Sequence, residues 1–287
     1  MGFKPCHHEL CLYVNTNYQG EIVYFLRQVD DFAVSAPTKS IAEHVISAIN
    51  SKMTIQIKPL GTINRFNGVD IAQTRNFIKV YNKTYIDKIL NDKDWLNNPI
   101  PEHENAPRIP MHNDAEYNRT IEQAEPMPDT DLPRFEKDIG FTYKQGIGEL
   151  IYAMVTCRPD ISFALIKLAQ YSARPAKQHF TALKGICAYL KNTRNEGIHY
   201  WRTKPRMDCP LIENPETLTD YNNYDPDASK STVAPDVADL HVDASYGADT
   251  IHRKSVTGMI ARLAGGTILY KTKFQDVVAL SSTEAEL

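Results

Sequence analysis

The sequence predicts an α+β protein, and three observations support this fold class. Residues 21–26 and 32–36 are rich in β-forming side chains and flank two adjacent aspartates, which predicts a β-hairpin. Residues 141–192 carry apolar side chains at helical spacing. A second group of strand-like runs follows residue 238, with Gly265-Gly266 as a tight turn. Strands and helices that are segregated along the chain in this way are typical of α+β proteins.

The N-terminal region, residues 1–98, is predicted to be one α+β unit. After the hairpin, residues 40–50 carry isoleucine and valine at helical spacing, and residues 85–90 predict a short helix. Between these helices, residues 54–57 and 77–80 predict strands.

Residues 99–140 predict an acidic, proline-rich connector. Seven of the seventeen prolines lie between residues 99 and 133, large aliphatic side chains are few, and residues 99–138 hold ten Asp/Glu against four Lys/Arg. Such a composition is typical of an extended, poorly packed linker or a loop.

Residues 141–206 form the predicted helical, basic region. Ile147, Leu150, Ile151 and Met154 make the apolar stripe of a first helix that ends before Pro159. A second helix follows from Asp160 and a third from residue 175, with four side chains on its buried face: Phe180, Leu183, Cys187 and Leu190.

The charge of this helical region is strongly positive, although the net charge of the whole chain is −3. From residue 141 to residue 206 there are eleven Lys/Arg against three Asp/Glu. On the third helix Lys177, Lys184 and Lys191 recur every seven residues and predict one stripe. The stripe is either a contact surface for a phosphate backbone or an ordinary solvated helix face.

The C-terminal region, residues 237–287, follows a second polar linker at residues 207–236. Residues 239–244, 256–263 and 267–270 predict strands. Ser281 and Glu284 have the spacing of a capping box at a helix start, which gives Glu284 a structural role and leaves Glu286 without one.

Two pairs of carboxylates are candidate metal ligands. Asp30 and Asp31 repel each other unless a cation lies beside them, and Mg²⁺ takes one or two protein carboxylates together with phosphate and water. The alternative is a solvated turn, because Asp is a favoured turn residue. Asp243 and Glu286 are a second candidate pair. The group Cys6, His7, His8 and Cys11 lacks a further ligand pair at zinc-finger spacing, so we expect loop and strand-edge positions there.

The remaining composition favours an intracellular protein. The five cysteines are odd in number and scattered, which suits reduced thiols. No apolar run approaches the ~18 residues of a membrane span, no signal peptide is evident, and Cys6 occupies the position where N-myristoylation needs Ser or Thr. Nothing in the sequence distinguishes a cytoplasmic particle from the nucleus or predicts an oligomeric state.

The motifs together resemble one family. Residues 27–31 resemble the catalytic hairpin of reverse transcriptases, in which two aspartates follow a tyrosine and a variable residue. The rest of the chain resembles copia-type retrotransposon polymerases in collinear order, at residues 2–5, 11–13, 60–69, 148–152, 158–161, 179–193, 243–246, 255–258 and 279–286.

This resemblance implies a partial palm and thumb, a helical connection, and the N-terminal part of a ribonuclease H-like α/β domain. It makes Asp30 and Asp31 ligands of a polymerase site, and Asp243 and Glu286 ligands of a nuclease site. Each site would hold two Mg²⁺, with Mn²⁺ as an alternative, and act on an RNA template, dNTPs or an RNA–DNA hybrid. The implied nucleic-acid contacts are Gln28, Arg158, Lys177, Lys184 and Lys191.

The sequence departs from the family pattern at three points. Gln28 replaces the tyrosine of the hairpin, the first catalytic aspartate would precede Met1, and the later ribonuclease H carboxylates would follow Leu287. We therefore expect a polyprotein segment that is inactive alone. The alternative is a non-catalytic remnant that at most binds nucleic acid. A cellular nucleotidyltransferase would leave residues 281–286 unexplained.

Overall fold

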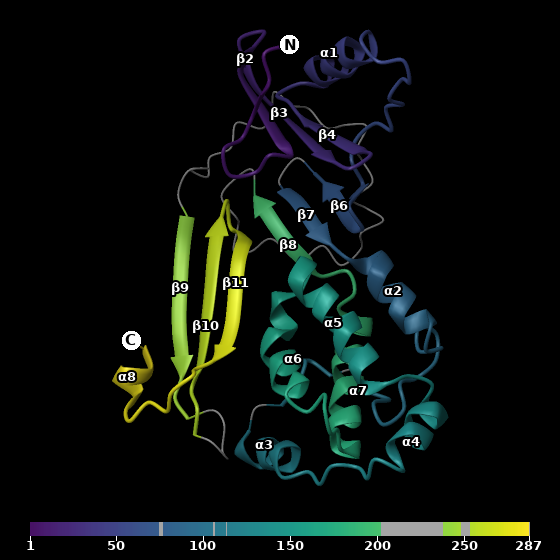
Figure 1. Cartoon of the computed structure of the whole chain (residues 1–287), viewed down its shortest axis with the longest axis vertical. Helices are drawn as coiled ribbons and strands as arrows, with labels where there is room; N and C mark the ends of the chain where they lie inside the picture. The colour runs from purple at the N-terminus through teal and green to yellow at the C-terminus, as the bar shows by residue number, and fades with distance from the viewer. Residues whose placement is uncertain (75–76, 106, 113, 202–237, 248–252, 287) are drawn as a thin grey trace.

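The computed structural model describes residues 1–74, 77–105, 107–112, 114–201, 238–247 and 253–286. It contains helices and three antiparallel sheets, in agreement with the predicted α+β class. The molecule is elongated: a small sheet lies at one end, and a helical body and a second set of strands lie at the other (Figure 1). In the described residues, no helix has both the length and the apolar character needed to cross a membrane.

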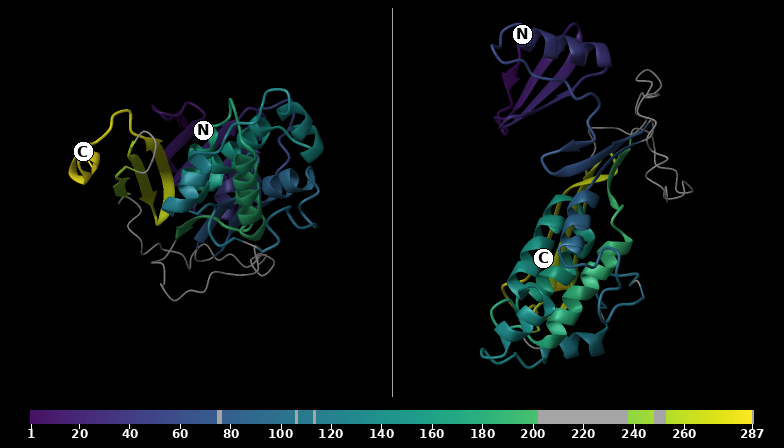
Figure 2. Two further views of the ribbon diagram at one scale, coloured as in Figure 1. Left: turned by 90° about the horizontal axis from the view of Figure 1, so that it is seen from below. Right: turned by 90° about the vertical axis from the view of Figure 1, so that its right-hand side faces the viewer.

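The N-terminal sheet confirms the predicted hairpin. Its strands pair antiparallel in chain order: β1 (Lys4–Pro5), β2 (Leu12–Tyr18), β3 (Glu21–Gln28) and β4 (Asp31–Ser35). Helix α1 (Lys39–Asn50) packs on the sheet and buries Val45 against Val23. Figure 2 shows this unit standing apart from the helical body.

Residues 54–57, predicted as a strand, do not form one. The side chain of Asn50 at the end of α1 both accepts from the Ile57 amide, at 2.7 Å, and donates to the Ile57 carbonyl, at 2.9 Å. The backbone is therefore satisfied by a side chain instead of a neighbouring strand, and Ile55 is left 82% exposed.

A second antiparallel sheet joins distant parts of the chain. Its order is β5 (Arg65–Phe66), β6 (Val69–Gln73), β7 (Phe77–Tyr81) and β8 (Gly197–Trp201). The predicted strand at 77–80 is confirmed as β7. The predicted helix at 85–90 is confirmed as α2 (Lys83–Asn91), whose first turn is held by Asp70 through the Thr84 amide and hydroxyl at 2.7 and 2.8 Å.

The helical body confirms the three helices predicted after residue 141. These are α5 (Tyr143–Cys157), then α6 (Ser162–Ala169) after the 3₁₀ turn η1 (Pro159–Ile161), and α7 (Lys177–Asn192). The four residues predicted for the buried face of α7 are all buried. On α5 the prediction was wrong for Ile151, which is 40% exposed, because Ala153 and Cys157 complete the buried face with Leu150.

Residues 99–140 are not the poorly packed connector that the composition predicted. They form α3 (Ala115–Glu122) and α4 (Leu132–Ile139), and four of their large apolar side chains are buried in the core of the helical body: Ile100, Met111, Ile121 and Met127. The Glu122 carboxylate lies 2.7 Å from the Lys167 ammonium, and both side chains are only 3% exposed. Charges from the acidic region thus pair with the basic region, and α2 also packs into this core.

The C-terminal strands form a third sheet in the order β11-β10-β9. They are β9 (Ala238–Ser245), β10 (Val256–Leu263) and β11 (Gly266–Phe274), and the short helix α8 (Ser282–Glu286) follows. The sheet lies beside α6 and β8 (Figure 1). The Tyr270 hydroxyl donates to the Met154 carbonyl on α5, and the Trp201 amide donates to the Ala264 carbonyl at 2.8 Å. The predicted linker at 207–236 lies outside the described residues.

Candidate functional site

Asp30 and Asp31 lie at the tip of the β3–β4 hairpin. Gln28 and Asp31 are the last paired residues, so Val29 and Asp30 form the corner of the turn. Both carboxylates are exposed. Within the described residues, no group of three or more His, Cys, Asp or Glu is arranged to hold a metal ion. Two carboxylates match the one or two that Mg²⁺ takes from proteins when phosphate and water complete its shell.

The backbone at this tip is constrained. Val29 has φ of 52° and is 80% exposed. A β-branched residue at positive φ is a genuine outlier, and such strain clusters at functional sites. Behind the tip, the Phe25 and Phe32 rings stack at 5.6 Å with 27° between their planes. The aromatic pair supports the strands that carry the two aspartates.

Asp243 and Glu286 are brought together although they are far apart in sequence. Glu286 Oε1 accepts from the amide of Ala244, the residue that follows Asp243, at 3.2 Å. Both side chains are exposed. Across the ladder Asp243 faces Gly258 on β10, so no side chain from that position occupies the space beside the carboxylate. Glu286 is thus held at the backbone next to Asp243, and both carboxylates are exposed.

Helix α8 is positioned by local capping. Ser281 Oγ accepts from the Glu284 amide at 3.1 Å, as the capping box predicted, and Glu284 Oε2 reaches back to the Leu280 amide at 2.7 Å. Gln275 Nε2 donates to both the Ala285 carbonyl, at 2.6 Å, and Thr257 Oγ1, at 2.9 Å, which ties α8 to β10. The contributions of Gly258 and Gln275 do not follow from the sequence, because only the folded structure brings them next to Asp243 and α8.

Two of the predicted nucleic-acid contacts are not accessible in the structure. Arg158 is 1% exposed; its Nη2 lies 2.6 Å from Asp160 Oδ2 and its Nη1 donates to the Thr193 carbonyl at 2.8 Å. Lys184 is 7% exposed. Arg158 therefore links the end of α5 to the end of α7, and Lys184 is covered because α7 is packed on most of its circumference. We correct the prediction for these two residues.

The other predicted contacts remain accessible. Gln28 is exposed beside Asp31. Lys177 is exposed, with its ammonium 5.9 Å from the centre of the Phe135 ring. Lys191 Nζ donates to the Asn98 carbonyl at 2.7 Å near the surface. Of the predicted lysine stripe on α7, only the two end residues, Lys177 and Lys191, are thus accessible.

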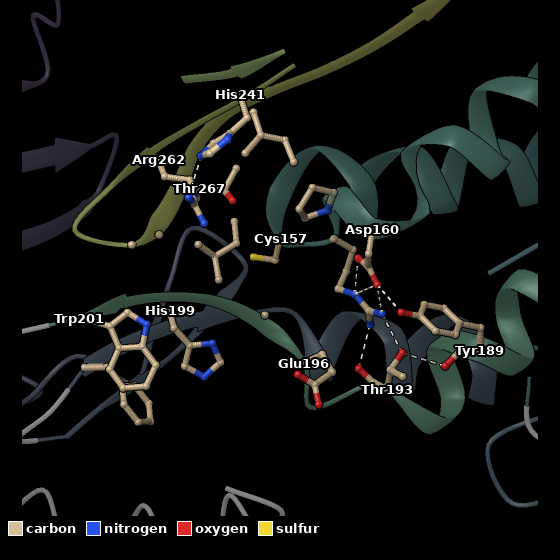
Figure 3. A pocket seen from close by; sticks show the side chains of 18 of the residues that line it. Cys157, Asp160, Tyr189, Thr193, Glu196, His199, Trp201, His241, Arg262 and Thr267 are labelled. Carbon is tan, nitrogen blue, oxygen red and sulfur yellow. Dashed lines mark hydrogen bonds and ion pairs between the residues drawn. The ribbon is translucent and has the colours of Figure 1, made fainter. Parts of the chain in front are cut away.

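A cleft of about 850 Å³ lies between β8, the end of α5, and the β10–β11 hairpin (Figure 3). Aromatic side chains of β7 and β8 form one wall: Phe77, His199 and Trp201. Arg262 and His241 face the cleft from the C-terminal sheet, with Arg262 Nη2 at 2.7 Å from His241 Nε2. Burial lowers the pKa of His199, as does the nearby Lys79 charge. The lining of the cleft comes from elements far apart in the chain, so the sequence alone does not predict it.

Comparisons with known proteins find similarity mainly to transposon proteins. It is 23% identical to the retrovirus-related Pol polyprotein from transposon TNT 1-94 of Nicotiana tabacum over 99% of this chain, which spans 18% of that polyprotein. It is 26% identical to a putative transposon Ty5-1 protein of Saccharomyces cerevisiae over 100% of this chain and 77% of the relative. Half of the chain is also 29% identical to secreted RxLR effector protein 161 of Plasmopara viticola, over 80% of that protein.

No known family profile matches the chain, and no solved structure matches it. Its homologues nevertheless include retrovirus-related Pol polyproteins from several transposons. The chain therefore corresponds to a segment of a retrotransposon Pol protein and spans less than a fifth of the polyproteins that it matches.

Proposed function

We propose that this chain carries carboxylates of two Mg²⁺-dependent sites of a retrotransposon RNA-directed DNA polymerase with an attached ribonuclease H. The observation that carries the proposal is the hydrogen bond from the Ala244 amide to Glu286, which sets Glu286 beside Asp243. Helix capping explains Glu284 but not Glu286. An exposed carboxylate that lies next to a second exposed carboxylate is suited to a cation.

The two pairs would serve related chemistry. Asp30 and Asp31 would hold Mg²⁺ on the phosphates of an incoming dNTP, where the ion favours attack by the primer 3′-hydroxyl and neutralises the leaving pyrophosphate. Asp243 and Glu286 would hold Mg²⁺, or Mn²⁺ in its place, against the scissile phosphate of the RNA strand in an RNA–DNA hybrid. Further ligands of each site would come from other parts of the Pol protein.

A second function is favoured by a different observation. The described residues contain no group of three potential metal ligands, and the hairpin has Gln28 where the resembled family has an aromatic ring. Both facts suit a chain that binds nucleic acid without catalysis. We therefore expect the purified chain alone to give neither primer extension nor hybrid cleavage with Mg²⁺. Incorporation that is abolished by Asp30→Asn would instead show a complete polymerase site.

Metal binding tests the proposal without requiring activity. Titration with Mn²⁺ should broaden the NMR signals of amides around residues 243–244 and of α8 first, because a paramagnetic ion acts on nearby nuclei even when affinity is low. Asp243→Asn should remove this local effect. Asp239→Asn, on the same strand and face, is the matched control and should leave it unchanged. Broadening that is uniform over the molecule, or unaffected by Asp243→Asn, would refute the nuclease-site assignment.

Binding of an RNA–DNA hybrid tests the basic surface. We expect weak binding whose affinity falls as salt rises, since each neutralised phosphate contributes about −0.9 to the slope of log K against log salt. Lys177→Gln combined with Lys191→Gln should make this slope shallower by roughly 2. Lys39→Gln on α1, which removes an exposed charge elsewhere, is the control. Affinity that does not vary with salt would rule out this surface as the contact for the hybrid backbone.

A further inference from the structure

We propose that the cleft between β8 and the β10–β11 hairpin binds one nucleotide unit, either as a free nucleoside monophosphate or as one residue of a single strand. This site is separate from the two carboxylate pairs, because none of Asp30, Asp31, Asp243 or Glu286 lines the cleft. It is therefore an addition to the proposed polymerase and nuclease functions and does not depend on them.

One wall of the cleft is a flat aromatic surface. His199 and Trp201 lie two residues apart on β8 and share one face of the strand. Their rings are nearly parallel, at 23° and 6.0 Å between centres, and Phe77 supports both edge-on at 4.9 and 5.2 Å. Stacking on such a surface accepts any base, because every base has a π-face.

The opposite wall offers a guanidinium with an unused donor. Arg262 Nη2 donates to His241 Nε2 at 2.7 Å and lies 3.8 Å from an Asp239 carboxylate oxygen. The Arg262 Nε atom is buried, and no acceptor for it is found among the described residues. The Arg262 side chain as a whole is 41% exposed, so the accessible part of its guanidinium can donate a charge-assisted hydrogen bond to a phosphate oxygen in the cleft.

The charge of the lining favours an anion. Arg108 adds a second exposed cation, from the segment before α3. Two acids also line the cleft: Asp160 is paired with Arg158, and Glu196 is the other. The lining thus holds three arginines, Arg108, Arg158 and Arg262, against these two carboxylates, with Asp239 beside Arg262 outside the lining. The volume of about 850 Å³ lies in the range of small-molecule sites, roughly 300–1,000 Å³.

Tryptophan fluorescence gives a direct test, because the chain has two tryptophans and only Trp201 lines the cleft. Trp95 is buried in the helical core. Adenosine 5′-monophosphate should quench the emission of the full chain and saturate. Adenosine should bind at least about tenfold more weakly, since one lost charge-assisted hydrogen bond is worth about that factor. Trp201→Phe should abolish the quenching.

Arg262→Gln tests the anion contact, since Gln retains a donor for His241 but lacks the charge; we expect at least about tenfold weaker affinity. Lys271→Gln is the matched control. The preceding residue, Tyr270, points toward the helical body, so Lys271 points away from it on the opposite face of the sheet. The Lys271→Gln variant should bind as the unmodified chain does. Circular dichroism of each variant establishes that it is folded, and Arg262→Lys should restore part of the affinity.

Oligonucleotides distinguish the two sources of the nucleotide unit. If the cleft takes one residue of a strand, affinity should rise from the monophosphate to a deoxyadenosine hexamer. If it takes a free nucleotide, affinity should stay constant or fall with length. No saturable quenching by the monophosphate or the hexamer at millimolar concentration would overturn the proposal. Equal affinity of Arg262→Gln and the unmodified chain would also overturn it.

Discussion

Val29 stores backbone strain directly beside the two aspartates of the hairpin. Its φ is 52°, and the other non-glycine residues with positive φ in the described part of the chain are not β-branched. Left-handed backbone costs an L-residue roughly 1–2 kcal/mol, and most for a branched side chain. The side chain is 80% exposed and contributes little packing in return. No local packing therefore offsets the strain, and uncompensated strain of this kind is typical of functional sites.

Val29→Gly is expected to stabilise the hairpin by about 1 kcal/mol, because glycine adopts positive φ without steric cost. Hydrogen exchange of the β3 and β4 amides should slow by about fivefold, the factor that corresponds to this energy. The exchange measurement is preferable to fluorescence because both tryptophans lie outside the N-terminal sheet.

Ile22→Gly provides the control for this prediction. Ile22 is half exposed on β3 and is absent from the residues with positive φ. Glycine there should speed exchange, since it only adds backbone freedom. Faster exchange in Val29→Gly as well would show that the turn is not strained.

At the scale of a helix, His179 fixes the start of α7. Its Nδ1 accepts from the Ala176 amide at 2.9 Å, and its Nε2 donates to the Ile121 carbonyl of α3 at 2.8 Å. The Tyr171 ring stacks on it at 3.9 Å. Acceptance at Nδ1 requires the neutral imidazole. Burial lowers the pKa of His179, and the bond to Ile121 opposes this only in part.

The stability of the helical body is therefore expected to fall in mild acid. A histidine with a lowered folded pKa contributes stability above its unfolded pKa of about 6.5, and this contribution is lost as the pH falls through the folded pKa. The loss is at most about 1.4 kcal/mol for each pH unit below 6.5. The urea midpoint from Trp95 emission, between pH 7.5 and 5, measures it.

His179→Gln should be less stable at pH 7.5 but lose less on acidification than the unmodified chain. His7→Gln, an exposed change in the N-terminal unit, is the control and should keep the full pH dependence. An identical pH dependence in His179→Gln would assign the acid sensitivity to other groups.

The elements that the sequence predicted are those whose signals are local. The β3–β4 and β10–β11 hairpins follow from turn residues between β-formers, and α5 and α7 follow from apolar spacing. The strand prediction for residues 54–57 was wrong because Asn50 makes the backbone hydrogen bonds that a strand partner would otherwise make. The linker prediction for the acidic segment was wrong because a few buried residues, such as Ile100 and Ile121, hold the segment in the core. Its overall composition nevertheless resembles that of a linker.

For the whole molecule, the docking of the C-terminal sheet depends on close packing at Gly266. A Cβ atom at this position would lie 2.4 Å from Tyr200 Cδ1 and 2.9 Å from the His199 carbonyl oxygen. The Tyr200 hydroxyl also donates to the Thr267 carbonyl at 2.9 Å. The aromatic wall of the cleft and the C-terminal sheet therefore meet where no side chain can be added.

Gly266→Ala is expected to loosen this contact while each sheet stays folded. Hydrogen exchange should increase at β8 and along β11, and small-angle scattering should show a larger radius of gyration. Gly258→Ala is the matched control on the same sheet, where the nearest atom to a Cβ is the Asp243 carbonyl oxygen at 3.9 Å. Unchanged exchange in Gly266→Ala would mean that the surrounding side chains absorb the methyl group.

The sequence alone singles out the two carboxylate pairs as candidate metal ligands, and their role stays a prediction. The sequence does not predict the cleft. Its lining combines β7, β8, the start of η1 and β10, and only tertiary structure brings these together. The burial of Arg158 and Lys184 was hidden for the same reason, because charge counted along the chain does not reveal which cations are paired inside.

The pairing of β7 with β8 has a consequence for the order in which this chain folds. Phe77 pairs with Trp201, and the whole helical body lies between them in sequence. Closing so long a segment is entropically costly and slow. We therefore expect β7 to keep an open edge during synthesis until α7 has formed and β8 can pair with it. An unpaired edge is a template for wrong partners, so the helical body acts as the scaffold on which the central sheet is completed.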